Sequence, residues 1–245
     1  MTLTVIHQDD RLIAIDKPAG LLVHRSDLDR HETDFAVQRL RAQVGRVVWP
    51  VHRLDKGTSG LLLFALDAEA ARDLGSQFER GEVAKRYLAV VRGIPEASGV
   101  IDHPLGRLPD EYGDRSTREV AQPAVTRYRR LATVELPVAV DRYPTSRYAL
   151  VELCPETGRR HQLRRHMKHL AHPIIGDATY GKGRHNRFFQ DHFGCHRLLL
   201  AAVGLAFKHP DDGREVILSA PPSPDFADCL RKLGWPDPTE DPSWP

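Results

Sequence analysis

A short polar turn carries the carboxylate that is best suited to do chemistry. Asp55 lies in residues 52–60, which read His-Arg-Leu-Asp-Lys-Gly-Thr-Ser-Gly. Arg53 and Lys56 flank it, and nearby cations favour the ionised form of a carboxyl group. The pattern also fits an ordinary polar turn whose aspartate is balanced by cations, because structural ion pairs are common. Asp55 is therefore a candidate reactive carboxylate that other segments must support.

A second stretch, residues 159–187, is strongly basic and holds eight arginines and lysines against a single acid, Asp177. A guanidinium group can bind a carboxylate through two parallel hydrogen bonds, so Arg164 is a candidate partner for Asp55. Charged runs of this kind also commonly face solvent without a specific role. A basic patch beside an otherwise balanced surface is typical of proteins that bind a phosphate backbone.

The same stretch contains His161, His166, His169 and His172, which invites a metal-site interpretation. Steps of about three residues spread side chains around a helix, and no cysteine or acid nearby completes a tetrahedral set of ligands. We therefore expect no metal site.

Tyr87 follows Lys85 with one residue between them, on a predicted strand. A tyrosine in such a position is mostly a core residue. Its ring could also stack on a base turned out of an RNA helix, which is worth about 1–3 kcal/mol per base. The residue alone does not decide between the two.

The composition is that of an ordinary globular protein, with 41% hydrophobic and 28% charged residues in a chain of 245. A net charge of +2 is too small to indicate a polyanionic partner by itself. No apolar run approaches ~18 residues and the N-terminus lacks a secretion signal, so we expect no membrane association and a cytoplasmic location. Three widely spaced cysteines indicate neither a disulfide framework nor a zinc site.

Hydrophobic periodicity predicts more strands than helices, and many neighbouring strands are close enough in sequence to be antiparallel. We expect an α+β fold with a mixed, largely antiparallel sheet and helices packed on it, formed by residues 1–235 as one domain. An acidic, proline-rich tail at 236–245 is expected to be flexible. Strands are predicted at 2–6, 11–16, 61–66, 85–91, 124–134, 147–153, 198–207 and 215–218, a polar loop at 106–122, and helices at 33–44, 67–79, 158–170 and 223–234. Asp67 is the expected N-cap of the helix at 67–79, and Gly81 is expected to end it. In the helix after Gly158, Leu163 and Met167 share an apolar face, and His161, Arg164 and Lys168 lie opposite.

Several stretches together resemble the RluA-type pseudouridine synthases, in order and in spacing, over almost all of residues 3–220. They are Lys17-Pro18-Ala19-Gly20 with Val23-His24, His52-Arg53-Leu54-Asp55 with Thr58-Ser59-Gly60, Lys85-Arg86-Tyr87, Gly158 to Arg164, His172 to Asp177, and Tyr180-Gly181.

This resemblance implies the pseudouridine synthase catalytic fold and the isomerisation of a uridine already present in RNA. By the same resemblance Asp55 is the catalytic aspartate, Arg164 its buried ion-pair partner and Tyr87 the ring against the uracil. Leu163 belongs to the apolar pocket, and Arg53 takes the place of the extruded nucleotide in the RNA stack. No electron or group comes from another molecule, so no cofactor is expected. Further contacts to RNA are expected from His52, Lys85, Arg159, His161 and Lys17.

Residues 122–126, 142–145 and 192–194 are similar to the members of the family that act on transfer RNA, at the junction of the acceptor and T stems. Ribosomal RNA is the alternative substrate, and a non-catalytic RNA-binding or RNA-folding protein is the alternative of another class. A glycoside hydrolase would also act at an anomeric carbon, but it usually needs two cooperating carboxylates, and the turn at 52–60 offers one.

One position departs from the family pattern. Leu200-Ala201-Ala202 stands where the family commonly has Leu-His-Ala. Ala201 therefore puts in doubt any contact that this histidine would make, but not the site built on Asp55.

Overall fold

The strand that follows the Asp55 turn lies in the interior of the sheet. All seven residues of β4 (Ser59–Ala65) are buried, as expected for a continuous apolar run with both faces covered. Leu62 and Phe64 pack into one hydrophobic cluster and Leu61 and Leu63 into another, because successive side chains of a strand point to opposite faces. The computed structural model describes residues 2–25, 32–106 and 120–236.

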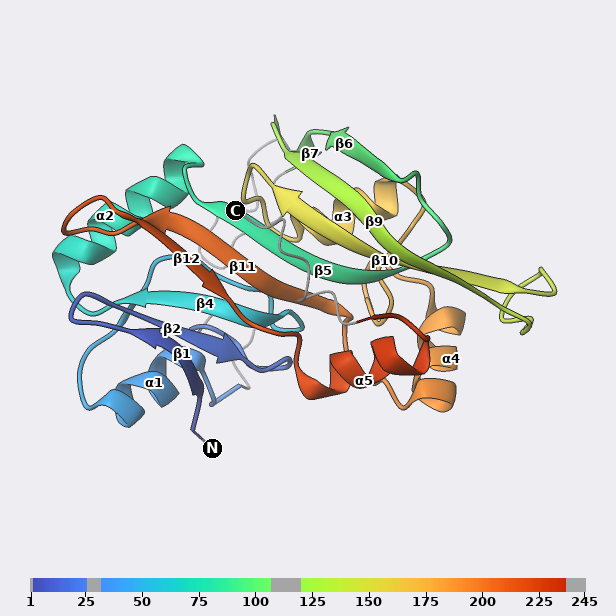
Figure 1. Cartoon of the computed structure of the whole chain (residues 1–245), viewed down its shortest axis with the longest axis horizontal. Coiled ribbons are helices and arrows are strands. Elements are labelled where there is room, and N and C mark those ends of the chain that lie inside the picture. The colour runs from blue at the N-terminus through green and yellow to red at the C-terminus, as the bar shows by residue number, and fades with distance from the viewer. Residues whose placement is uncertain (1, 26–31, 107–119, 237–245) are drawn as a thin grey trace.

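Within these residues the chain forms a ten-stranded sheet with the order β1-β2-β4-β11-β5-β10-β9-β6, in which β12 also pairs with β11 and β3 with β4 (Figure 1). Among the described strands of this sheet, only the pairing of β4 with β11 is parallel. The sheet is therefore mixed and largely antiparallel, and the α+β prediction is confirmed. The remaining strands of the sheet are β1 (Thr4–Gln8), β2 (Leu12–Lys17), β3 (Trp49–Pro50), β5 (Ala84–Arg92), β6 (Ser98–Asp102), β9 (Val125–Leu136), β10 (Ser146–Pro155), β11 (Leu200–Lys208) and β12 (Glu215–Ser219). A separate pair is formed by β7 (Leu105–Gly106) and β8 (Ala121–Gln122).

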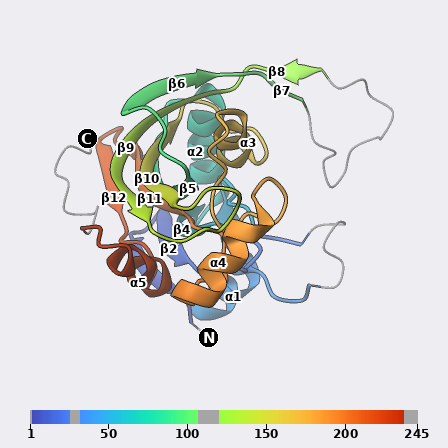
Figure 2. The same cartoon turned by 90° about the vertical axis from the view of Figure 1, so that its right-hand side faces the viewer.

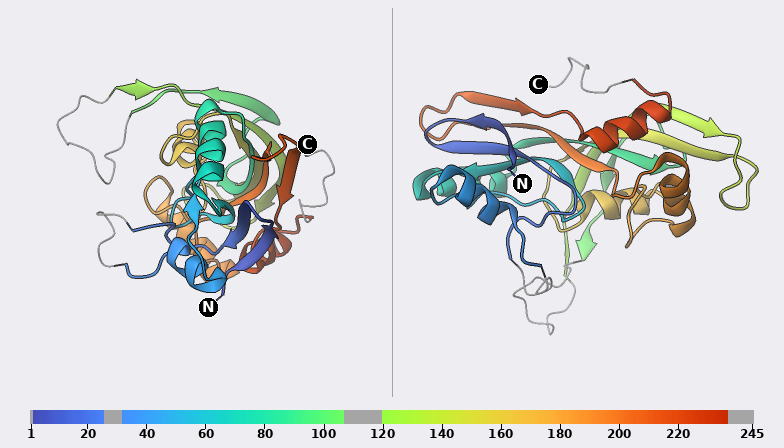
Figure 3. Two further views of the ribbon diagram at one scale, coloured as in Figure 1. Left: turned by 90° about the vertical axis from the view of Figure 1, so that its left-hand side faces the viewer. Right: turned by 90° about the horizontal axis from the view of Figure 1, so that it is seen from below.

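Five helices pack on the sheet in the described part of the chain: α1 (Ala36–Val44), α2 (Ala68–Arg80), α3 (Gln162–His169), α4 (Gly183–Phe193) and α5 (Pro224–Lys232). Helices α1 and α2 lie at one end of the sheet and α4 and α5 at the other (Figure 3). The sheet bends, and α3 lies inside the bend (Figure 2). Helices α1 and α3 contribute to the hydrophobic cluster that also contains Leu54, Tyr87 and Leu198. This cluster forms the base of the site.

Several sequence signals act as predicted. The side chain of Asp67 caps α2 by accepting hydrogen bonds from the N–H groups of Glu69 and Ala70, and Gly81 ends the helix in the left-handed conformation. The polar loop predicted at 106–122 lies outside the described residues over 107–119, and so does the tail from residue 237 on.

Five elements of the described residues are not predicted by the sequence patterns, namely helix α4 and the strands β3, β6, β7 and β8. Helix α4 has the sequence GRHNRFFQDHF, with few strong helix formers and no side-chain cap, and it is held by burial of Phe189 and Phe193 against the sheet. Strand β6 pairs with β9 although its own residues are mostly exposed, so it shows no apolar run.

Candidate active site

The turn that carries Asp55 is shaped by backbone hydrogen bonds on both sides. The N–H of Thr58 donates to the carbonyl of Asp55 at 3.0 Å, and the N–H of Gly20 donates to the carbonyl of Lys56 at 2.8 Å. Gly60 then enters β4 with φ +104°, where a Cβ would come within 2.0 Å of the carbonyl oxygen of Ala202. Only glycine permits this approach of β4 to β11, which fixes where the turn stands relative to the sheet.

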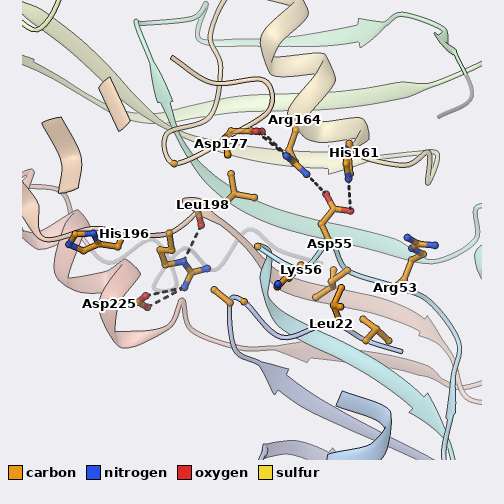
Figure 4. Close-up of a pocket in the computed structure, with 18 of the residues that line it drawn as sticks. Leu22, Arg53, Asp55, Lys56, His161, Arg164, Asp177, His196, Leu198 and Asp225 are labelled. Atoms are coloured by element: carbon orange, nitrogen blue, oxygen red, sulfur yellow. Dashed lines mark hydrogen bonds and ion pairs between the residues drawn. The ribbon is translucent and has the colours of Figure 1, made fainter. Parts of the chain in front are cut away.

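Arg164, from the first turn of α3, contacts the carboxylate of Asp55. Its Nη1 lies 3.2 Å from Oδ2 of Asp55 (Figure 4). The two other nitrogens of the same guanidinium donate to Asp177, Nε to Oδ2 at 2.7 Å and Nη2 to Oδ1 at 2.9 Å. The side chains of Arg164 and Asp177 are 11% and 0% exposed, and that of Asp55 is 20% exposed. One buried arginine thus joins a fully buried carboxylate to one that faces a cavity.

Asp177 belongs to the same ion-pair network, although the sequence patterns did not assign it to the site. Its carboxylate also accepts hydrogen bonds from the N–H groups of Thr179 and Tyr180, each at 2.9 Å. Burial would raise the pKa of Asp177, but the hydrogen bonds from Arg164 and from these two N–H groups outweigh it and lower the pKa. Asp177 was visible in the sequence as the single acid of a basic stretch, directly after a glycine.

Gly176 explains how Asp177 reaches this position. It has φ +80°, and a Cβ would lie 1.8 Å from the carbonyl oxygen of Arg197. Two glycines, Gly60 and Gly176, therefore pack against the backbone of residues 197–202 and bring the two carboxylates to the same side of β11.

Asp55 opens into a cavity of about 670 Å³. Its charged lining is predominantly basic, with three aspartates, Asp55, Asp177 and Asp225, against the cations Arg53, Lys56, Arg160, Arg164 and Arg197. A concave surface of this size and sign fits an anionic nucleotide.

Tyr87 and Leu163 lie behind Asp55 and not on the cavity wall. They are 9% and 7% exposed and share a hydrophobic cluster with Leu54 and Leu198, both of which line the cavity. Burial, and to a smaller extent the charge of Asp55, raises the pKa of Tyr87, so the phenol stays protonated. These side chains form an apolar layer directly beside the carboxylate.

Lys17 is not placed where RNA could reach it. Its side chain is fully buried, and Nζ donates to the carbonyls of Pro18 at 2.9 Å, Leu21 at 2.8 Å and Lys56 at 3.3 Å. The three donors of an ammonium group are thereby matched by three acceptors. The expectation of an RNA contact is wrong for this residue, because its ammonium ties the loop after β2 to the Asp55 turn.

His52 and Lys85 also serve the scaffold in this structure. The Nε2 of His52 accepts a hydrogen bond from the N–H of Leu63 at 3.0 Å, and its ring stacks on Phe78 with centroids 4.6 Å apart. Burial and then Lys85 lower the pKa of His52 to about 3, in keeping with a neutral ring that accepts. Lys85 is 9% exposed and directs Nζ to the carbonyl of Thr157.

Arg53, Arg159 and His161 occupy accessible positions. Arg53 and Arg159 are exposed, and Nε of Arg159 donates to the carbonyl of Pro123 at 3.1 Å. His161 lines the cavity with Nε2 at 3.9 Å from Oδ1 of Asp55. The cationic face expected for α3 is only partly solvated, because Arg164 is buried and Arg165 donates to the carbonyl of Gly106 at 2.9 Å.

The four histidines that follow Gly158 do not share one set of partners, although His166 and His169 both contact His103. Nδ1 of His161 bonds the hydroxyl of Tyr180, His166 lies between Thr126 and the carbonyl of His103, His169 stacks on His103, and Nδ1 of His172 bonds the carbonyl of Arg92. Among the residues that the structure describes, no group of three or more histidines, cysteines or acids is arranged to hold a metal ion.

Ala201 faces away from the site. It pairs with Leu88 and packs in the cluster that contains Phe189, whereas its neighbour Ala202 pairs with Tyr87. A side chain at position 201 therefore points to the opposite face of the sheet from Asp55.

The fold defines a class. The structure is similar to human RNA pseudouridylate synthase domain containing 4, with a TM-score of 0.70 and 28% identity over 94% of this chain and 93% of that one. It is also similar to human RNA pseudouridylate synthase domain containing 1, with a TM-score of 0.69 and 28% identity over 93% and 87% of the two chains.

The sequence comparisons are more specific. Residues 11–169 match the family described as RNA pseudouridylate synthase, and the chain belongs to this family. It is 48% identical over 235 residues to tRNA pseudouridine synthase C of Vibrio cholerae, covering 95% of this chain and 96% of that one. It is 50% identical over 237 residues to tRNA pseudouridine synthase C of Pasteurella multocida, covering 96% and 98%. The protein is thus an RNA pseudouridine synthase. None of the helices in the described residues has the length and apolarity that a membrane crossing requires.

Proposed function

We propose that this enzyme isomerises one uridine of transfer RNA to pseudouridine, at the junction of the acceptor and T stems (position 65 in the relatives it resembles), and that Asp55 is its catalytic residue. The observation that carries the catalytic assignment is the pair of contacts made by Arg164, to Asp55 at 3.2 Å and bidentately to the buried Asp177. The relatives named tRNA pseudouridine synthase C, matched over about the full length of both chains, support the substrate.

The reaction rearranges bonds within one nucleotide. The C1′–N1 bond breaks, the uracil turns within the site, C5 bonds to C1′, and the proton on C5 leaves while N1 gains one. Asp55 is the carboxylate that starts this rearrangement. It attacks C6, attacks C1′ or removes the 2′ proton. Oδ2 of Asp55 is held by Arg164, and Oδ1 lies on the cavity side near His161. The arginine therefore fixes the orientation of the carboxylate before the substrate enters, which is how positioned groups lower a barrier.

The target uridine must leave its helix to reach Asp55. Extruding a base costs a few kcal/mol, which contacts in the pocket must offset. Leu54 brings the apolar layer that it forms with Tyr87 and Leu163 to the cavity wall, and so offers a surface on which a uracil ring can pack. Arg53 fills the gap left in the stack, a role that its exposed position two residues before Asp55 supports.

Affinity for RNA comes chiefly from phosphates. Exposed cations at the cavity and beside it, Arg53, Lys56 and Arg159, supply the charge. Binding should therefore weaken steeply with salt for any RNA, so discrimination must come from shape. The stacked acceptor and T arms of a transfer RNA present one continuous helix that suits the limited surface of this chain.

Mapping pseudouridine in transfer RNA and ribosomal RNA after incubation with pure protein tests the substrate. We expect one modified uridine at the stem junction of intact transfer RNA, and much weaker modification of an isolated stem-loop, which lacks the stacked helix. Efficient modification confined to ribosomal RNA would refute the substrate and leave the chemistry standing.

A further inference from the structure

His161 occupies a backbone conformation that non-glycine residues seldom adopt. It precedes α3 with φ 55° and ψ 25°, in the left-handed region. Such conformations are costly and persist where the surrounding structure fixes them, commonly at functional sites. Here Gln162 provides the fixation: its buried side chain bonds the carbonyl of Val125 at 3.0 Å, the hydroxyl of Thr126 at 3.0 Å and the N–H of Arg159 at 2.9 Å.

This conformation directs the imidazole to Asp55. Nε2 of His161 lies 3.9 Å from Oδ1 of Asp55, on the side of the carboxylate that Arg164 leaves open (Figure 4). At the other end of the ring, Nδ1 lies 3.1 Å from the hydroxyl of Tyr180. The two rings meet edge to face with centroids 5.7 Å apart, so the imidazole is braced as well as hydrogen-bonded.

Electrostatics decide which nitrogen carries the proton. Burial, the largest influence, lowers the pKa of His161, so the ring is neutral and has a single N–H. A lone pair on Nε2 would face the carboxylate of Asp55 and be repelled, whereas an N–H there is attracted. The proton therefore belongs on Nε2, and Nδ1 accepts from the Tyr180 hydroxyl. The cation of Arg164, 5.1 Å from the centre of the Tyr180 ring, holds the phenol in place.

We propose that His161 is a positioning residue for Asp55 and that Tyr180 acts through it, by fixing the tautomer that points Nε2–H at Oδ1. The 3.9 Å gap is longer than a hydrogen bond, and it closes when the nucleotide fills the cavity and displaces water. Asp55 is then held by Arg164 on one oxygen and by His161 on the other, in the one rotamer that faces the uridine. This inference rests on the proposed function of Asp55.

Substituting His161 by glutamine or by asparagine tests the two nitrogens of the imidazole separately, because each amide can replace the contact of one nitrogen only. In His161→Gln an N–H can stand where Nε2–H does, so it can still reach Asp55. In His161→Asn the shorter amide can meet only the Tyr180 hydroxyl, and asparagine tolerates the left-handed conformation, which protects the fold. Tyr180→Phe keeps the ring and removes only the hydroxyl. His7→Gln, on β1 and away from the cavity, is the matched control.

The experiment measures the single-turnover rate of pseudouridine formation in intact transfer RNA and the Kd for the same RNA at fixed salt. We expect His161→Asn to lose about 100-fold in rate and His161→Gln less than about fivefold, with Kd unchanged in both, because misplacing a reacting group by about 1 Å costs on that order. Tyr180→Phe should lower the rate about tenfold when introduced into the wild type, but less than about twofold when introduced into His161→Gln. A residue that acts through His161 has no effect once the imidazole is gone.

Equal rates for His161→Gln and His161→Asn would overturn the proposal. So would a Tyr180→Phe effect of the same size in both backgrounds, a result that does not depend on the stability of His161→Asn. Asp55→Asn, measured in parallel, separates the catalytic role of Asp55 from the positioning role of His161. An active Asp55→Asn contradicts the proposed function itself. An inactive Asp55→Asn together with equal rates for His161→Gln and His161→Asn contradicts only the role of His161.

Discussion

Two arginines line the same cavity and are buried to nearly the same extent, yet they have different kinds of partner. Arg164 is 11% exposed and binds two carboxylates, those of Asp55 and Asp177, which are 20% and 0% exposed. Arg197 is 9% exposed and binds the exposed Asp225 at 3.1 Å, the hydroxyl of Ser59 at 2.6 Å and the carbonyl of Leu198 at 3.0 Å.

The difference shows that Arg164 serves the site, whereas Arg197 serves the scaffold. The partners of Arg197 are on β4, in the irregular segment before β11 and at the start of α5, so it ties three parts of the chain together with groups that are satisfied in place. Arg164 compensates one carboxylate that is fully buried and orients another that opens into the cavity. Removing either arginine should destabilise the protein, but only the loss of Arg164 should disable the reaction.

Arg164→Met is the largest expected effect. It leaves two carboxylates without their cation, and breaking a buried pair in this way costs about 3–5 kcal/mol. Loss of the fixed orientation of Asp55 should lower the single-turnover rate at least about 100-fold. Denaturant unfolding and rate measurements on the same preparation check both, and a folded Arg164→Met with nearly full activity would remove the distinction drawn here.

Double-mutant cycles sharpen the comparison within the site. Arg164 and Asp177 share two bonds of 2.7 and 2.9 Å in full burial, whereas Arg164 and Asp55 share one of 3.2 Å at a more exposed carboxylate. The coupling energy for unfolding should therefore be larger for Arg164→Met with Asp177→Asn, at about 2–3 kcal/mol, than for Arg164→Met with Asp55→Ala, at about 1 kcal/mol. Additivity in either cycle would show that the pair is not coupled, and the reverse order would make Asp55 the main structural partner.

Arg197→Met should lower the free energy of unfolding by about 1–3 kcal/mol, because hydroxyl and carbonyl partners lose a buried donor. The rate at saturating transfer RNA should stay within about fivefold of the wild type, since no bond joins Arg197 to Asp55. A rate loss as large as that of Arg164→Met would place Arg197 in the site.

Lys17 gives the smallest expected effect, and a pH dependence with a definite sign. Burial, and then the charge of Arg197, lowers the pKa of Lys17 to about 7 in the folded protein, below its value of 10.5 in the unfolded chain. Between these values the unfolded chain binds the extra proton, so folding stability rises with pH. The wild type should gain about 1.5 kcal/mol over Lys17→Met between pH 7 and 8.5. A difference that stays constant, or shrinks, would show that the three carbonyls keep Lys17 charged at an ordinary pKa.

The α+β class, the buried strand after Asp55 and the Asp67 cap of α2 follow from local patterns, so the sequence predicts them. What it does not predict depends on tertiary packing. Helix α4 is stabilised by burying Phe189 and Phe193, not by helix-forming residues. Lys17 is a basic residue in a polar stretch, and only the packed chain shows that its ammonium group is buried.

The sequence predicts the residue types of the site but not all of its members, because some positions depend on tertiary packing. Asp55 and Arg164 could be matched as candidate partners by type, but the position of Asp177 depends on how closely Gly176 approaches the backbone of Arg197. The strained conformation of His161 likewise arises from the anchoring of Gln162, which is a contact between distant segments.

The most direct test of the account is the Asp55→Asn variant, which keeps the shape of the side chain and removes its charge. The measurement is release of tritium from RNA labelled at C5 of uridine, because forming pseudouridine expels that hydrogen, together with Kd for the same RNA. If Asp55 is catalytic, Asp55→Asn should give no detectable release and a Kd close to that of the wild type, since phosphate contacts supply most of the binding. Removing a catalytic group should lower the rate far more than tenfold. Tritium release by Asp55→Asn within about tenfold of the wild-type rate would therefore contradict the central role of Asp55.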